Sequence, residues 1–132
     1  MKYKKTLVMA SIFGALAVSL GAFGAHGLKS MVSADRIGIF ETGVRYQFYH
    51  TFGLFVVALV GEWLAPERFF RLASGLFIGG MVLFSGSLYL LACRDFLGLE
   101  AWTMVLGPMT PIGGLCLVLG WLFLGIGVAR RA

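Results

Sequence analysis

The sequence predicts an all-α membrane protein, a four-transmembrane-helix bundle that forms a single domain over residues 1–132. The first observation is composition, because 59% of the residues are hydrophobic and 13% are charged, about half the charged fraction of a soluble domain. The second is pattern, because four apolar stretches cover roughly residues 6–25, 43–64, 72–92 and 103–128. A helix of about 20 residues crosses a hydrocarbon core about 30 Å thick.

The first helix is expected over residues 6–25, directly after the basic start "MKYKK". A secretory signal peptide has the same order of features, with Gly24 as the last residue before cleavage. Against that alternative, the apolar run is long for a signal core, and cleavage would place the C-terminal arginines opposite the new N-terminus. We therefore expect no cleaved signal peptide.

The second helix is expected to begin near residue 34, outside the hydrocarbon, and to continue to residue 64. Ser33 is a suitable N-cap, and Asp35 places a negative charge in the first turn. No proline interrupts the following segment, "ADRIGIFETGVRYQFYHTF". The other two helices are expected over residues 72–92 and 103–128.

The start of the second helix is unusually polar for a membrane segment. In "FETGVRYQFYH", residues 40–50, the polar and charged side chains include Glu41, Arg45, Tyr46, Gln47, Tyr49 and His50. At about 100° per residue, Glu41, Arg45 and Tyr49 share one face of a helix, and Tyr46 and His50 share an adjoining face.

Glu41 and Arg45 are four residues apart, with the acid first, which is the favoured order for an ion pair. One interpretation is a salt-bridged collar that faces water at the membrane surface. The interpretation we adopt is that Arg45 points into the bundle and lies beside His50. Its positive charge would then lower the proton affinity of the imidazole.

The chain has two histidines, His26 and His50. His26 follows the first helix and His50 lies inside the second, so we expect them at similar depths on neighbouring helices. Ionisable groups inside a membrane usually face the protein interior or a cavity. His50 is therefore either a structural residue that donates one hydrogen bond or a residue that binds a ligand or carries a proton.

The fourth helix contains "LGPMTPIGGL", with Pro108 and Pro111 three residues apart. Each proline removes a helical hydrogen bond, so we expect the helix to be kinked or broken there. The freed carbonyl groups need partners because lipid offers none, and Thr110, Ser85 or Ser87 would serve. A broken helix would also leave backbone groups free to coordinate a ligand.

Small residues recur every four positions on two of the expected helices. They are Ala17, Gly21 and Ala25 on the first helix and Gly75 and Gly79 on the third. This spacing allows helices to approach closely in lipid, either within the bundle or between two copies of the chain.

Seven of the 11 Lys and Arg residues precede the first helix, lie between the second and third, or follow the fourth. With four spans these regions share one side of the membrane, so the excess of basic residues places both termini in the cytoplasm. The basic residues lie at the ends of the apolar stretches and form no patch, so no nucleic-acid partner is expected.

Four segments resemble the small YgdD-type inner-membrane family of unknown function: "GAFGAHGL" (21–28), "FETGVRYQFYH" (40–50), "FSGSLYLL" (84–91) and "TPIGGLCLVLGW" (110–121). The resemblance covers essentially the whole chain, with its motifs in order. It implies a four-span protein of the bacterial inner membrane, with related small membrane proteins in animals. It implies no activity, substrate or cofactor.

The chain shows no P-loop, GxGxxG, CxxC, HExxH or GxSxG motif, so enzymatic activity is not favoured. His26, His50 and Cys93 are suitable zinc ligands, but they lack the short local spacing of zinc sites. We predict no cofactor and no metal site. Haem or quinone bound through His26 and His50 is the redox alternative.

The leading hypothesis is a protein that binds or transports a small ligand or lipid headgroup in an outward-facing polar cavity. The cavity is expected between the first, second and fourth helices. Its candidate residues are His26, Glu41, Arg45, Tyr46, Gln47, Tyr49, His50 and Thr110. A structural or assembly role without a ligand is the third hypothesis. The expected partners are membrane lipid, a small molecule, and a second copy or another membrane protein.

Overall fold

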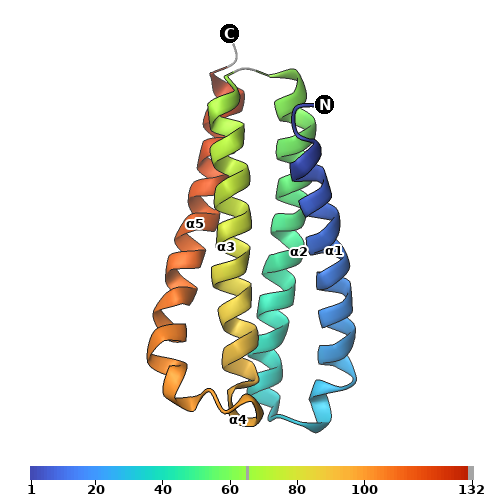
Figure 1. Cartoon of the computed structure of the whole chain (residues 1–132), viewed down its shortest axis with the longest axis vertical. Helices are drawn as coiled ribbons and strands as arrows, with labels where there is room; N and C mark the ends of the chain where they lie inside the picture. The colour runs from blue at the N-terminus through green and yellow to red at the C-terminus, as the bar shows by residue number, and fades with distance from the viewer. Residues whose placement is uncertain (65, 131–132) are drawn as a thin grey trace.

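The computed structural model describes residues 1–64 and 66–130, and its elements are all helices. Four long helices run up and down side by side (Figure 1): α1 (Lys4–Ala25), α2 (Ala34–Trp63), α3 (Glu67–Ala92) and α5 (Thr103–Ala129). Three short elements, η1 (Leu28–Ser30), α4 (Arg94–Leu97) and η2 (Glu100–Trp102), lie in the connections at the end opposite the termini. Each apolar stretch of the sequence corresponds to one long helix.

Three segments of the described chain are long and apolar enough to cross a membrane: Lys4–Ser30, Glu67–Ala92 and Glu100–Ala129. The helix outside this set is α2, although it has 30 residues. Its first half contains four charged residues and Gln47, and its second half still contains His50 and Glu62, so polar side chains lower the hydropathy along the whole helix. By length and composition, therefore, the span candidates number three rather than the expected four.

The central pair of the bundle is formed by α2 and α3. On one side α1 packs against α2, and on the other α5 packs against α3, so the four helices follow one another across the molecule in the order α1, α2, α3, α5 (Figure 1). The outer position of α1 explains why its buried residues are only Ala10, Ala17 and Gly24. Both termini lie at the same end of the bundle.

The contact between α3 and α5, called the seam below, is built on a seven-residue repeat in each helix. The repeating positions are Phe70, Phe77 and Phe84 on α3 and Gly113, Gly120 and Gly127 on α5. A Cβ atom at Gly120 would lie 2.6 Å from the Phe77 ring, and one at Gly113 would meet the backbone nitrogen of Phe84. Such a repeat keeps the same faces of two helices in contact along their length, and the glycines let them approach closely.

Small residues occupy this seam, but they are not those that the four-residue spacing predicted. A Cβ atom at Gly75 or Gly79 would have no neighbour within 4 Å in the described chain, so that expectation of a close contact within the bundle was wrong. The reason is geometric, since these two glycines lie on the outward face of α3. On α1, Ala17 is buried, whereas Ala25 is exposed.

The expected break in the fourth helix is not present, because α5 is helical from Thr103 to Ala129 with Pro108 and Pro111 inside it. Both prolines are exposed, and the buried face of α5 remains packed on α3 around them. The Thr110 hydroxyl lies 2.7 Å from that of Ser87 and 3.4 Å from the Leu106 carbonyl oxygen. A bend at the prolines stays a prediction.

Candidate binding site

His50 lies near the middle of the bundle. At 1.5 Å per residue it is about 24 Å from the start of α2, and its side chain is buried. The ring centroid lies 5.6 Å from that of Phe77 and 6.0 Å from that of Trp121. His50 Nδ1 lies 2.6 Å from the Tyr46 carbonyl oxygen. Because a carbonyl oxygen only accepts, Nδ1 carries the proton, and Nε2 of the neutral ring is an acceptor.

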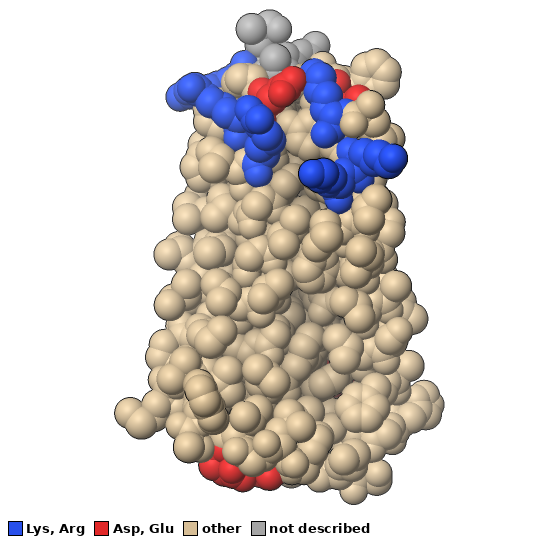
Figure 2. All heavy atoms as spheres, viewed as in Figure 1, with Lys and Arg blue, Asp and Glu red and all other residues tan. Residues whose placement is uncertain are grey.

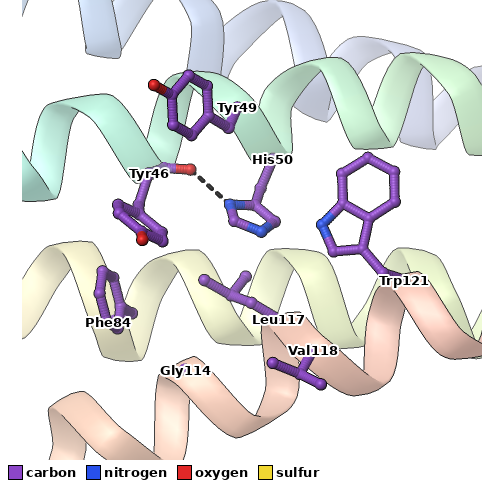
Figure 3. A pocket seen from close by; sticks show the side chains of 8 residues that line it. All are labelled: Tyr46, Tyr49, His50, Phe84, Gly114, Leu117, Val118 and Trp121. Atoms are coloured by element: carbon purple, nitrogen blue, oxygen red, sulfur yellow. Dashed lines mark hydrogen bonds between the residues drawn. The ribbon is translucent and has the colours of Figure 1, made fainter.

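A groove of about 440 Å³ lies beside His50 between α2, α3 and α5. Its lining residues are Tyr46, Tyr49, His50, Phe84, Gly114, Leu117, Val118 and Trp121. Figure 3 shows the His50 ring between Tyr46 and Trp121, with its second nitrogen directed away from the Tyr46 carbonyl group. Tyr49, Val118 and Trp121 are exposed, so the groove opens on the side of the bundle.

The walls of the groove are mostly apolar, and three polar tips reach into or beside it. They are Nε2 of His50, the indole nitrogen of Trp121 and the hydroxyl group of Tyr46 (Figure 3). The described part of the chain supplies a hydrogen-bond partner to the His50 ring only at Nδ1 and to neither of the other two tips. No fully buried side-chain nitrogen or oxygen of these residues lacks a partner, so these tips are accessible from outside the core. The groove therefore combines one acceptor and two donors with aromatic surface.

Gln47 lies away from the groove, in the interior between α1 and α3. Its side-chain nitrogen donates to the Phe13 carbonyl oxygen at 2.8 Å, and its side-chain oxygen accepts from the Tyr89 hydroxyl at 2.7 Å. The Thr51 hydroxyl donates to the Gln47 carbonyl oxygen at 2.8 Å. This network links three helices, and its groups are satisfied by the protein itself.

The expectation that Arg45 points into the bundle was wrong. Arg45 and Glu41 are both exposed, and the described part of the chain shows no ion pair between them. The buried positions of α2 repeat every three or four residues through Phe40, Gly43, Gln47 and His50, and Arg45 falls between them. The expected influence of Arg45 on His50 therefore has no basis in the geometry.

The sequence suggested that the two histidines lie at similar depths, but the structure places them at different depths. His26 is the exposed C-cap of α1, at the end where α2 begins, and its Nδ1 lies 3.0 Å from the Ala22 carbonyl oxygen. Gly24, near the end of α1, lies against Phe40, and His50 is ten residues, or about 15 Å, beyond Phe40 along α2, so the structure does not bring the two rings together. The described residues contain no group of three or more His, Cys, Asp or Glu side chains that could hold a metal ion.

Of the predicted site residues, the structure brings Tyr46, Tyr49 and His50 together in the groove. Thr110 lies at the seam between α3 and α5, where it contacts Ser87. The expected cavity between α1, α2 and α5 is replaced by a groove against α3, because α5 packs on α3.

Five lining residues were missed: Phe84, Gly114, Leu117, Val118 and Trp121. The seven-residue repeat in the sequence points to them. Phe84 is one of its positions, Leu117 packs in the same contact between α3 and α5, and Trp121 directly follows Gly120 of the repeat.

A family described as "Protein of unknown function (DUF423)" matches residues 20–114. The UPF0382 membrane protein YwdK of Bacillus subtilis (strain 168) is 36% identical over 127 residues, which cover 96% of this chain and 98% of the relative. The UPF0382 inner membrane protein YgdD of Escherichia coli (strain K12) is 38% identical, over 94% of this chain and 88% of the relative. No solved structure matches the chain.

Proposed function

The chain belongs to the DUF423 family of membrane proteins, and we propose that it crosses the bacterial inner membrane four times and binds a lipid-soluble molecule in the groove beside His50. The observation that carries this proposal is the hydrogen bonding of the two nitrogens of the His50 ring. One nitrogen is held by the Tyr46 carbonyl group, and the other is offered to an aromatic groove halfway along the bundle.

Four spans are supported by the antiparallel arrangement of the helices. With 30 residues, α2 is about 45 Å long, and it lies side by side with the apolar helices α1 and α3, one on each side of it (Figure 1). Its buried residues include Gln47, His50 and Thr51, so much of its polarity is turned away from lipid. Polar groups in a membrane segment are tolerated when they face the protein.

The orientation of the bundle in the membrane is inferred from the distribution of its charged residues. Figure 2 shows Lys and Arg side chains gathered at the end that carries the termini. Among residues 1–64 and 66–130, that end holds six of the ten basic residues. An excess of Lys and Arg in short cytoplasmic segments supports the placement of both termini in the cytoplasm.

The groove has the size and surface of a ligand site. Binding sites for small molecules are commonly about 300–1,000 Å³, mostly apolar, with a few placed polar groups. An unpartnered polar group in hydrocarbon costs several kcal/mol, so an occupant that hydrogen-bonds to His50 and Trp121 is favoured over an alkyl chain alone. Aromatic surface on both sides suits a flat ring.

The chemistry of the three polar tips selects the ligand class. His50 Nε2 accepts a hydrogen bond, whereas the indole N–H of Trp121 donates one. A hydroxyl group both donates and accepts, so it satisfies the pair, and a quinol ring adds flat aromatic surface. We therefore propose a neutral, lipid-soluble alcohol or quinol. Arg45 and Gln47, which the sequence suggested as contacts, have no part in it.

Thermal unfolding in mild detergent tests this function. The probes are decylubiquinol and 1-dodecanol, each compared with dodecane, which lacks the hydroxyl group. We expect the hydroxyl-bearing probes to raise the melting temperature of the wild type and of His26→Phe, but not of His50→Phe or Trp121→Phe. Equal stabilisation of His50→Phe and the wild type would contradict the proposal. If no probe raises the melting temperature of the wild type and His50→Phe fails to fold, a purely structural role is favoured.

A further inference from the structure

A second pocket lies at the end of the bundle that carries the termini, between the start of α1 and the start of α3. Its volume is about 410 Å³, and it is lined by Lys2, Tyr3, Thr6, Glu67, Arg71 and Ser74. We propose that this pocket binds a phosphate-bearing anion at the membrane surface, with Arg71 as its main contact. This site is separate from the groove beside His50 and does not depend on it.

The charges around the pocket leave one cation available. Lys2 Nζ lies 2.9 Å from a Glu67 carboxylate oxygen, and the N-terminal amine lies 3.8 Å from one of Glu62. The two carboxylates at this end are therefore engaged with cations. Arg71 also lines the pocket, and it forms no ion pair with another residue of the described chain.

Hydroxyl groups complete the donor set. Thr6 Oγ1 and Ser74 Oγ lie 3.4 Å apart, one on α1 and one on α3. This distance is long for an O–H···O hydrogen bond, so their pairing competes weakly with an anion placed between them. The guanidinium group of Arg71 presents a planar fork that matches two oxygens of a phosphate group.

The depth of the pocket suits a lipid headgroup. Arg71 is about 6 Å along α3 from its first residue, Glu67. Lys4, Lys5, Arg68 and Arg130 belong to the same end of the molecule, where Figure 2 shows the basic side chains. Clusters of basic residues beside a membrane helix attract anionic lipids, and basic pockets between helices bind their headgroups.

Native mass spectrometry of the full-length protein tests the site. The protein is titrated in neutral detergent with phosphatidylglycerol or with phosphatidylcholine, and bound lipid is counted. We expect phosphatidylglycerol to be retained by the wild type and to bind roughly fivefold more weakly to Arg71→Gln, the effect of about one basic contact at a membrane surface. The matched control is Arg68→Gln, which removes the same charge from the same helix but does not line the pocket. Its retention is expected to equal that of the wild type.

A second arm separates the two sources of phosphate. Inorganic phosphate at millimolar concentration is added to the lipid-bound wild type, and its release of phosphatidylglycerol is measured together with its effect on melting temperature. If phosphate both displaces lipid and stabilises the protein, the pocket takes free phosphate. If only the lipid binds, the ligand is a headgroup. Equal loss of lipid in Arg71→Gln and Arg68→Gln, or no binding of either probe, would overturn the proposal.

Discussion

Gln47 and His50 are one helical turn apart on α2, both are buried, and yet they have different roles. Gln47 has protein partners for both ends of its amide group, Phe13 and Tyr89. His50 has a protein partner at Nδ1 alone among the described residues. A buried group with protein partners stabilises one arrangement of helices, whereas a ring nitrogen that is reachable from a groove and has no protein partner is available to a ligand. The sequence "RYQFYH" does not distinguish them, because the difference depends on which helix faces each side chain.

Replacement of Gln47 by leucine should weaken the bundle without affecting the groove. Loss of the amide leaves the half-buried Tyr89 hydroxyl without its acceptor, and we expect the free energy of unfolding to fall by about 1–2 kcal/mol. Unfolding in mixed micelles measures this change. In Gln47→Leu/Tyr89→Phe the loss should be smaller than the sum of the two single variants, because both disrupt the same bond. Strict additivity would show that the bond contributes nothing.

The thiol of Cys93, just beyond α3, should react slowly at neutral pH. Burial raises the pKa of Cys93, so the folded protein holds less thiolate than a free cysteine does at the same pH. In a Cys116→Ala background, alkylation by iodoacetamide should keep accelerating above about pH 8.5, the ordinary pKa of a thiol. The contribution of this group to stability should also fall as the pH rises above that value. A rate that reaches half of its plateau value at or below about pH 8.5 would contradict the expected shift.

The bounds of α1, α2 and α5 lie within a few residues of those expected from the sequence, whereas α3 begins at Glu67, five residues before its expected start at residue 72. The contact faces of the helices were not predicted. Helix ends were expected at residues 34 and 64, and α2 runs from Ala34 to Trp63. Ser33 is the N-cap by its extended backbone conformation, although its side chain makes no capping hydrogen bond with the described residues. The contact faces were misjudged for Gly75, Gly79 and Arg45, because small or charged residues at four-residue spacing do not reveal which neighbour they meet. The seven-residue repeat of α5 contains that information.

The seam between α3 and α5 gives a direct comparison of two glycines. Gly113→Ala should destabilise the protein by about 1–3 kcal/mol, because the new Cβ atom would meet the backbone of Phe84. Gly75→Ala is the matched control, since nothing lies within 4 Å of its Cβ position; it should be neutral, or stabilising by up to about 1 kcal/mol. Thermal unfolding compares the two. Equal unfolding temperatures of the two variants would contradict the close contact between α3 and α5 at Gly113.

On the scale of the whole molecule, the bundle has two unlike ends and a groove that opens on its side. The end with the termini is basic and holds the pocket around Arg71. The groove beside His50 is halfway between the ends and opens laterally. This division could not be derived from the sequence alone, because it depends on the order α1, α2, α3, α5 across the bundle.

The orientation of the bundle predicts where fused reporters become active. Green fluorescent protein fused after residue 132 should fluoresce, and alkaline phosphatase at the same position should be inactive, since both termini are expected in the cytoplasm. The same reporters inserted after Gly98, in the connection between α3 and α5, should give the opposite pattern. A fluorescent protein that is active at both positions would contradict four spans.

An experimental structure of the protein in lipid nanodiscs, with the groove resolved at side-chain level, tests the central claim most directly. The proposed function predicts elongated density between Tyr46 and Trp121, with a polar end about 2.7–3.2 Å from His50 Nε2. A His50 ring turned so that both nitrogens bond to the protein, in a groove filled by its own side chains, would contradict it.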